Sequence, residues 1–392
     1  MSQLITSLSS YWNKIQGTLF PFLEEELDPL TTKQQQLIKI LELVRIEESI
    51  PRSYAWKGRP QKGRRAIARA FVAKAVYNMG TTTVLIERLH SDKSLRRICG
   101  WESIKEIPSE STFSRAFAEF SDASLSQRVH EALIKKTLGE EIVLDNSRDS
   151  TAIEAREKPV AKQKEEPHDS IVQTSTTAKP KIKKKGRPPK GQEKPIQEPT
   201  RIEKQKNMTL TEMIADLPKE CGKGGKKDSK GNTMYWTGYK LHLDVVCGCI
   251  PVSAIVTSAS VHDSQVAIPL ATITAQRTTV LYDLMDSAYD IPGIIEHSRS
   301  LGHVPLIDKN PRGNKELQAQ IKAEAKAKKT LNLIFPEEIH YNARTTVERA
   351  NSRLKDEFGA CQVRVRGHAK VTCHLMFSVL VLAADQLMRL VT

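Results

Sequence analysis

The sequence has few cysteines, and they are far apart. Six occur in 392 residues, at positions 99, 221, 247, 249, 361 and 373. This scatter is unlike the dense framework of a small disulfide-stabilised domain. Cys247 and Cys249 lie near His242, but a C-x-C spacing without a second suitable pair does not match the usual zinc sites. We therefore expect neither disulfides nor a zinc centre.

Long hydrophobic stretches are also missing. The longest apolar run, Leu375–Ala384, is about half of the ~20 residues that a membrane-spanning helix needs. Residues 1–20 do not show the charged start and apolar run of a secretory signal. From these absences we expect a soluble, cytoplasmic protein with no membrane partner.

Acidic residues are in the minority. The chain has 60 Lys and Arg against 46 Asp and Glu, a net charge of +14. A basic excess of this size favours a polyanionic partner, because each neutralised phosphate of a nucleic acid releases condensed counterions. Hydrophobic residues make up 39% of the chain, which is enough to bury a sizeable core. The length of the chain is sufficient for two or three domains.

One internal segment, residues 158–206, contains no aromatic residue. It holds seven of the nineteen prolines, fourteen Lys and Arg and six Asp and Glu, and so carries +8 of the net charge. Such a composition cannot bury enough apolar surface to offset its ordering entropy, which predicts a disordered basic linker. Within it, Arg187 in Lys-Gly-Arg-Pro-Pro-Lys is similar to the core of an AT-hook that enters a narrow minor groove. The alternative is a solvated spacer.

On either side of this linker the patterns differ. Residues 1–138 read as an all-helical N-terminal domain, with helical spacing over Ala66–Met79, Thr83–Leu89 and Glu110–Phe120. Residues 139–157 begin a strand-containing domain, which resumes at 207–392 with strands near 239–246, 252–256, 279–284 and 303–307. Helices are expected near 263–273, 291–301, 315–329, 343–358 and 374–390. Strands followed by mixed strands and helices predict an α/β (α+β) catalytic domain.

The helical region is a candidate DNA-binding domain. Glu110–Phe120 follows Pro108-Ser109, a helix start signal, and could be the recognition helix of a helix-turn-helix. Arg64, Arg65, Arg69 and Lys74 add basic character upstream. A plain helical bundle with solvated basic residues is the alternative.

A charged stripe marks the segment 341–355. Tyr341, Arg344, Glu348 and Lys355 occur at offsets 0, 3, 7 and 14. On one helix these positions fall within an arc of roughly 60°. An acid flanked by two cations and a phenol suits a metal ion and phosphates, whereas the plainer reading is an amphipathic helix with charge pairs.

The spacing Tyr-x2-Arg-x3-Glu-x6-Lys resembles the YREK signature of a large branch of bacterial insertion-sequence DDE transposases. Two further blocks are similar to that family: Arg148-Asp149-Ser-Thr151, and Asp286-Ser-Ala-Tyr289, in which Ala288 replaces a glycine. Gly238–Leu243 and Val261–Gln265 also resemble family blocks. The resemblance covers most of residues 140–390 outside the linker. It implies an RNase H-like mixed sheet and a bacterial, nucleoid-associated enzyme.

By that resemblance Asp149, Asp286 and Glu348 are the catalytic and metal-binding residues. Tyr341, Arg344, Lys355 and Arg187 are the expected DNA contacts. Mg²⁺ or Mn²⁺ is the expected cofactor, with two ions, because Mg²⁺ binds few carboxylates plus substrate oxygens. Rivals remain: Asp145 for Asp149, Asp283 or Asp290 for Asp286, and Glu338 or Glu357 for Glu348. His262 could act as a base or only as a hydrogen-bonding residue, and Trp236 could stack on a base or pack in the core.

The expected activity is binding of terminal inverted repeats in double-stranded DNA, metal-dependent phosphodiester cleavage and strand transfer. The alternatives are a catalytically inactive DNA-binding regulator and an RNase H-like nuclease that never joins strands. Because the two element ends are inverted, a homodimer on DNA is the simplest assembly.

Overall fold

The computed structural model describes residues 2–27, 29–51, 63–159, 199–227, 231–333, 335–361 and 363–391. Most of the predicted linker, including Arg187 and its hook-like motif, lies outside these ranges. Residues 199–206 are inside them and differ from the prediction. Thr200 forms a capping box with Glu203, which starts the short helix α9, Arg201–Gln205. Ile202 of that helix is buried, so the linker ends several residues earlier than expected.

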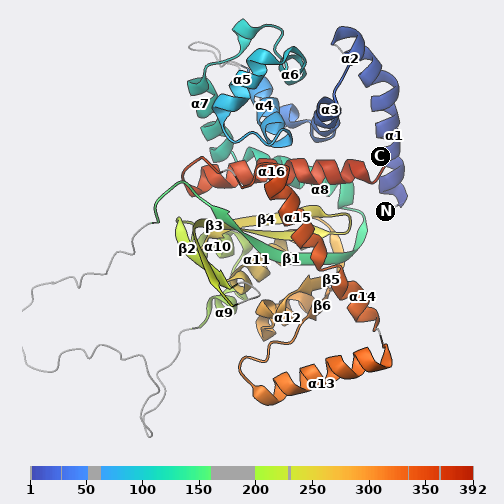
Figure 1. The fold of residues 1–392 in the computed structure, drawn as a ribbon, viewed down its shortest axis with the longest axis vertical. Helices are drawn as coiled ribbons and strands as arrows, with labels where there is room; N and C mark the ends of the chain where they lie inside the picture. Colours follow the sequence, from blue (N-terminus) through green and yellow to red (C-terminus); the bar gives the residue numbers. More distant parts are fainter. Residues whose placement is uncertain are drawn as a thin grey trace, which may run out of the picture.

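Within the described residues, six strands form one mixed sheet (Figure 1). They are β1 Ile142–Glu154, β2 Gly222–Lys227, β3 Thr233–Val246, β4 Ile250–Ser258, β5 Thr279–Met285 and β6 Val304–Ile307. The order is β2-β3-β1-β5-β6, and β4 pairs with the second half of β3. β1 is antiparallel to β3 but parallel to β5, which is parallel to β6. This arrangement confirms the predicted RNase H-like fold class.

Helices cover both faces of the sheet and extend beyond it. The N-terminal helices are α1 Ser2–Lys14, α2 Phe20–Glu26, α3 Thr32–Val44, α4 Arg64–Val76, α5 Thr82–Ser91, α6 Lys93–Cys99, α7 Glu110–Asp122 and α8 Leu125–Leu138. Those after β1 include α9, α10 Leu210–Asp216, α11 Ala267–Ala275, α12 Pro292–Ser300, α13 Lys315–Leu331, α14 Pro336–Asn342, α15 Thr345–Asp356 and α16 His368–Arg389. Helices α11 and α12 lie on one side of the sheet and α15 crosses the other (Figure 1).

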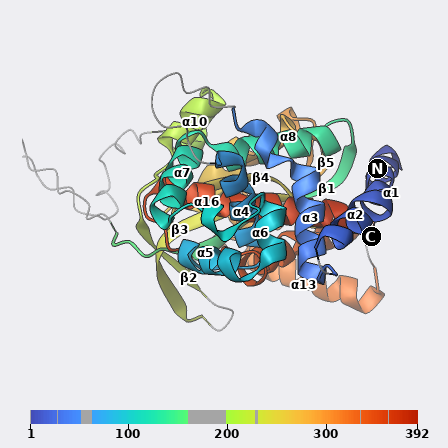
Figure 2. The same ribbon diagram turned by 90° about the horizontal axis from the view of Figure 1, so that it is seen from above.

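The last helix, α16, joins the two halves of the molecule. It packs against β4 and also against α3, α4, α7 and α8, and Figure 2 shows it running beneath the N-terminal helices. By length and composition it could cross a membrane, but 89% of its most apolar window is buried inside the fold. Helix α16 is therefore the central core helix, and the N-terminal helices share one core with the catalytic domain.

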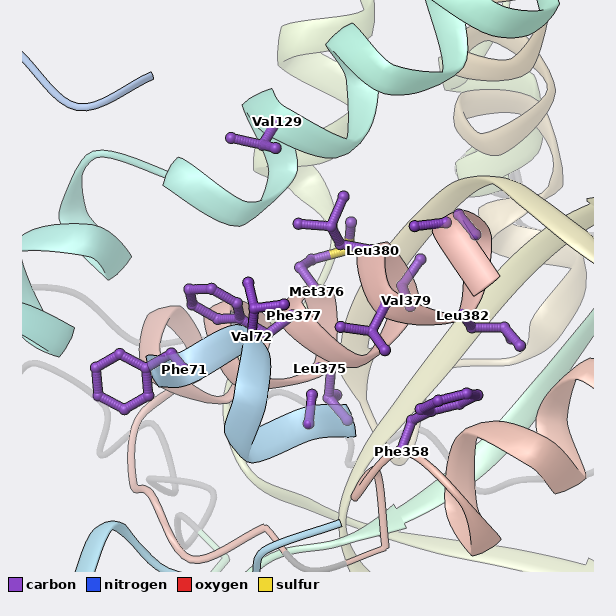
Figure 3. Packing of buried hydrophobic residues seen from close by; sticks show 14 of the residues in the cluster. Phe71, Val72, Val129, Phe358, Leu375, Met376, Phe377, Val379, Leu380 and Leu382 are labelled. Carbon is purple, nitrogen blue, oxygen red and sulfur yellow. The ribbon is translucent and has the colours of Figure 1, made fainter. Parts of the chain in front are cut away.

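An aromatic cluster marks this shared core (Figure 3). Phe71 of α4 packs edge-on or tilted against Phe113, Phe117 and Phe120 of α7 and against Phe377 of α16. Burying such rings contributes roughly 1.5–3 kcal/mol each. The predicted apolar stripe of 110–120 thus faces inward, and only the opposite face of α7 is free to meet a partner.

Two arginines that were expected to add basic surface are neutralised by carboxylates. Arg64 forms a bidentate pair with Glu119 at 2.6 Å, and Arg69 bonds to Glu47 at 2.7 Å. Arg65 and Lys74 have no acidic partner among the described residues. In the free protein, Arg64 and Arg69 are therefore less available for DNA contact than the unpaired cations Arg65 and Lys74.

Candidate active site

Strand β1 presents different side chains to its two faces, because successive residues in a strand alternate. Ser147 donates to the carbonyl of Ala343 at 3.0 Å, so its face is the one covered by α15. By alternation Asp149 lies on that same face. Asn146 and Arg148 point to the opposite face, where they meet buried aspartates.

Asp149 and Asp286 come from neighbouring strands. Asp149 is on β1, paired with Leu243 of β3, and Asp286 directly follows β5, the parallel neighbour of β1. The pKa of Asp149 is raised to about 6, chiefly by burial and to a smaller extent by the charges of Asp263 and Asp286. The Ser150 backbone and Lys226 act in the opposite direction. The structure therefore brings the first two predicted acids close enough to interact, in a place where negative charge is poorly compensated.

Asp145, Asp283 and Asp290 are each held by local partners. Asp145 bonds to His340 at 3.0 Å, and Asp290 accepts a bond from the backbone of Asn310 at 2.9 Å. Asp283 is fully buried and accepts bonds from Ser298 and Asn146 at 2.6 and 2.9 Å. These contacts give the three residues structural roles. Asp286 likewise accepts a bond from the Ala288 backbone at 2.9 Å, so its selection rests on its proximity to Asp149.

The glutamate rivals are also bound elsewhere. Glu338 pairs with Lys328 at 2.6 Å and Glu357 with Arg353 at 2.7 Å. Glu348 itself lies in the first turn of α15, with its side chain 52% exposed, and pairs with Arg344 at 3.1 Å. The structure places Glu348 on the helix above β1, bonded to a cation and not to the two aspartates.

The four-residue stripe is not on one helix, contrary to the sequence-based expectation. Tyr341 belongs to α14, and a turn at Ala343 and Arg344 separates it from α15. The Tyr341 hydroxyl donates to Asp308 at 2.6 Å, and the Arg344 guanidinium lies 5.8 Å from the centre of its ring. Tyr341, Arg344 and Glu348 still form one chain of contacts.

Two lysines flank the aspartates without an acidic partner among the described residues. Lys226 of β2 lowers the pKa of Asp149. Burial lowers the pKa of Lys355 of α15, and the charge of Lys226 lowers it further. Lys355 is half-buried and Lys226 is exposed, and two like charges close together are a ready site for phosphate oxygens. Sequence reasoning selected Lys355 but missed Lys226, which lies in a glycine-rich segment without a motif.

The β2–β3 ribbon that carries Lys226 also exposes aromatic surface. Tyr235 is 80% exposed. Trp236 packs over Gly224, where a Cβ would approach the indole ring to 2.4 Å, and its Nε1 donates to the Tyr239 carbonyl at 3.1 Å. Trp236 therefore supports the ribbon, and Tyr235 is the residue placed for stacking on a partner.

A second group of polar residues adjoins Asp149 and was not assigned a role from sequence. Asp263 accepts a bond from Lys240 at 2.9 Å. Burial alone would raise the pKa of Asp263, but His242 and Lys240 lower that pKa below its usual value. The Tyr289 hydroxyl is buried without a hydrogen-bond partner, and the charges of Asp263, Asp149 and Asp286 act on it. Two sequence blocks, Gly238–Leu243 and Val261–Gln265, contained the signal for Lys240 and Asp263.

His262 has a local structural role. Its Nδ1 lies 2.8 Å from the Ser264 hydroxyl, and its side chain caps the short helix Asp263–Val266. This contact accounts for the residue without assigning it a role as a base.

The donor set fits a divalent cation in part. Asp149 and Asp286 supply carboxylate oxygens, which Mg²⁺ and Mn²⁺ prefer, and a cation between them would relieve the charge repulsion that raises the pKa of Asp149. Among the residues that the structure describes, no three His, Cys, Asp or Glu side chains converge as a metal site. Glu348 would have to leave Arg344 to become the third ligand.

The sequence matches two transposase families. A family described as the transposase DDE domain covers residues 149–383, more than half of the chain. The chain belongs to the transposase DDE domain family. A second family, described as a transposase domain (DUF772), covers residues 23–119, which are the N-terminal helices. No curated protein and no solved structure shows significant similarity to the chain.

Membership supports DNA transposase activity, DNA as the partner and a divalent metal as the cofactor in general terms. The matched DDE region begins at Asp149 and includes Asp286 and Glu348. It also includes α16, which the structure places in a core shared with the DUF772 helices.

Proposed function

We propose that this transposase binds the terminal inverted repeats of an insertion sequence of the YREK branch, cleaves a phosphodiester there and transfers the DNA end to a target. The observation that carries the proposal is the pair Asp149 and Asp286. These carboxylates come from two neighbouring parallel strands, and burial, together with the charges of Asp263 and Asp286, raises the pKa of Asp149 to about 6. A buried acid with a raised pKa beside a second acid is a candidate functional group.

Each residue has a role in that reaction. Asp149 and Asp286 would hold Mg²⁺ or Mn²⁺, two ions in the complete site, with Glu348 as a further ligand. When bound, the metal supplies Lewis-acid stabilisation of the phosphoryl transfer. Lys226 and Lys355 bind non-bridging phosphate oxygens. In cleavage, water attacks phosphorus and the 3′-oxygen leaves; in transfer, that 3′-hydroxyl attacks a target phosphate and a target 3′-oxygen leaves.

The Arg344–Glu348 pair links DNA binding to completion of the site. An exposed i,i+4 pair contributes only about 0.3–0.5 kcal/mol, whereas a bidentate bond from arginine to phosphate is stronger. A DNA phosphate therefore competes well for Arg344. Its departure frees the Glu348 carboxylate to turn toward the aspartates, so the third acid joins only when DNA is present.

The test uses an oligonucleotide duplex from the end of the encoding element, a target plasmid and Mg²⁺. The proposal predicts nicking at the duplex end and joined products. Nicking without joined products would make the protein a nuclease of the same fold. Binding without any cleavage would make it a regulator and overturn the proposal.

We also propose a homodimer on DNA, one subunit for each inverted end. The net charge of +14 opposes association of the free protein until DNA neutralises it. Light scattering of the complex should give two chains with two duplex ends. A complex of one chain and one end that is competent for strand transfer would contradict the dimer.

A further inference from the structure

A cavity of about 480 Å³ lies at the junction between the N-terminal helices and the catalytic domain. Its walls come from α4 and the start of α5, from the segment after β1, and from the segment between α15 and α16. The two halves are joined here directly, because the Asn78 side chain donates to the Asp356 carbonyl at 2.8 Å. The cavity lies beyond the C-terminal end of α15, and the lining residues include neither Asp149 nor Asp286.

The lining is strongly cationic. Lys74, Arg156, Arg364, Arg366 and Lys370 all line the cavity, against one acid, Glu110. Glu110 already accepts a bond from the Thr83 hydroxyl at 3.1 Å. None of the five cations makes a salt bridge or a side-chain hydrogen bond within the part of the chain that the structure describes. An excess of unpaired positive charge around one cavity selects for an anion.

Lys74 is the unusual member of this group. It is only 8% exposed, on a helix whose other buried residues include Ile67 and Phe71. Burial lowers its pKa to about 8, and no acid compensates. Nearby His374 donates from Nε2 to the Gly359 carbonyl at 3.1 Å. Burial and the charge of Lys74 lower the pKa of His374 to about 3, so His374 is neutral and Lys74 provides the deep charge.

A buried, unpaired ammonium destabilises the free protein, since desolvation is not offset by any bond. An apolar residue of similar length would pack there at lower cost. A ligand anion in the cavity would provide the missing partner. The start of α5 adds hydroxyl groups at the same cavity, from Thr81 and Thr82.

We propose that this cavity binds a phosphate group, with the Lys74 ammonium at its base and the four exposed cations at its entrance. The phosphate comes either from the backbone of bound DNA or from a free phosphate compound. The DNA source rests on the proposed function, and it fits the position of Arg156, which follows the strand that carries Asp149. A strand of DNA held at Lys226 and Lys355 would then continue toward the cavity.

The test variant is Lys74→Met, which keeps the length of the side chain and removes the charge. Because the ammonium is unpaired, this protein should be at least as stable as the wild type, so lost binding is not lost folding. Arg364→Gln with Arg366→Gln is a second variant that changes only exposed residues. Lys136→Met, an exposed lysine at the end of α8, is the matched control for the loss of one charge.

Two binding measurements distinguish the sources. In the first, inorganic phosphate is titrated at constant ionic strength while the thermal midpoint is followed. In the second, affinity for a duplex of about 30 base pairs is measured across a salt series. For DNA, Lys74→Met should weaken binding about tenfold and lower the salt slope by about one unit. For a free compound, phosphate should raise the midpoint of the wild type and of Lys136→Met, but not of Lys74→Met.

A change in the DNA arm assigns the site to the DNA backbone, and a change in the phosphate arm alone assigns it to a free phosphate compound. If Lys74→Met and the double arginine variant match the wild type in both arms, the cavity is not a phosphate site. Neither binding measurement depends on catalysis. A failure of the strand-transfer assay would therefore not affect the interpretation of phosphate binding at the cavity.

Discussion

Two groups of carboxylates lie on opposite faces of β1, and their electrostatics differ. On one face Arg148 forms two bonds of 2.7 Å with Asp244 and lies 3.8 Å from Asp283. Burial alone would raise the pKa of Asp283, but Arg148, together with His303 and Ser298, holds it well below its usual range. On the other face Asp149 has no such cation, and its pKa is raised.

The comparison separates acids that stabilise the fold from acids that are available for chemistry. Asp244 and Asp283 are buried but paired, so they are stable as anions. Asp149 and Asp286 are close together and incompletely paired, which lowers the stability of the free protein. A bound cation would remove this destabilisation. One strand thus carries a structural residue, Arg148, directly beside a catalytic candidate, Asp149.

The largest expected effect is on catalysis. Asp149→Asn, Asp286→Asn and Glu348→Gln should each reduce cleavage by about a thousandfold or more, because each removes a carboxylate from the metal site. Binding to DNA should not fall, since each change removes a negative charge and leaves Lys226, Arg344 and Lys355 in place. Gel-based cleavage and binding assays on the same preparations measure both. Robust nicking by any one of the three would remove that residue from the site.

The opposite face should respond in stability. Arg148→Met leaves Asp244 and Asp283 buried without their cation, and we expect a loss of about 3–5 kcal/mol in the free energy of unfolding. Chemical denaturation measures it. A loss below about 1 kcal/mol would mean that the buried ion cluster does not hold the sheet together as inferred.

Acidity should distinguish the two faces further. The pKa of Asp149 is about 6 in the folded chain, against 3.8 for an unperturbed aspartate. Between about pH 4 and pH 6 the folded state therefore binds more protons than the unfolded state does. Stability should therefore fall as pH rises from about 4 to 6, by up to about 3 kcal/mol from this residue. Asp149→Asn should flatten that part of the profile in metal-free buffer. An identical pH dependence in both proteins would show that Asp149 is not strained.

The smallest expected effect is at the surface pair. Arg344→Met should change the free energy of unfolding by about 0.5 kcal/mol or less, since the pair with Glu348 is solvent-exposed. It should nevertheless weaken binding to an element-end duplex, because Arg344 loses its phosphate contact. Fluorescence anisotropy and denaturation on the same protein measure the two effects. Unchanged affinity for the end would leave Arg344 as a partner of Glu348 only.

Much of the fold and part of the site could be predicted from local patterns. The strand-containing stretch expected at 139–157 forms β1, Ile142–Glu154, and the strands near 239–246 and 279–284 are β3 and β5. Asp149 and Asp286 were found because each lies within a short block of chemistry-bearing residues. The helix break at Ala343 and Arg344 was missed, because no glycine or proline interrupts the helical spacing there.

Contacts between distant segments could not be predicted. Arg148 and Asp244 are 96 residues apart, and no local spacing shows that they pair. The same holds for Lys74, which the sequence presents as one basic residue among several but the fold buries beside α16. The shared core was also hidden, since α16 belongs to the catalytic domain in sequence and packs against the N-terminal helices in space.

The most direct test compares Asp149→Asn with Asp145→Asn, two aspartates on the same strand and the same face. Mg²⁺-dependent nicking of an element-end duplex is measured for both proteins, with folding checked by thermal denaturation. We predict that Asp149→Asn is inactive and that Asp145→Asn, which loses only its contact with His340, retains nicking. An active Asp149→Asn beside an inactive Asp145→Asn would contradict the assignment of the catalytic face.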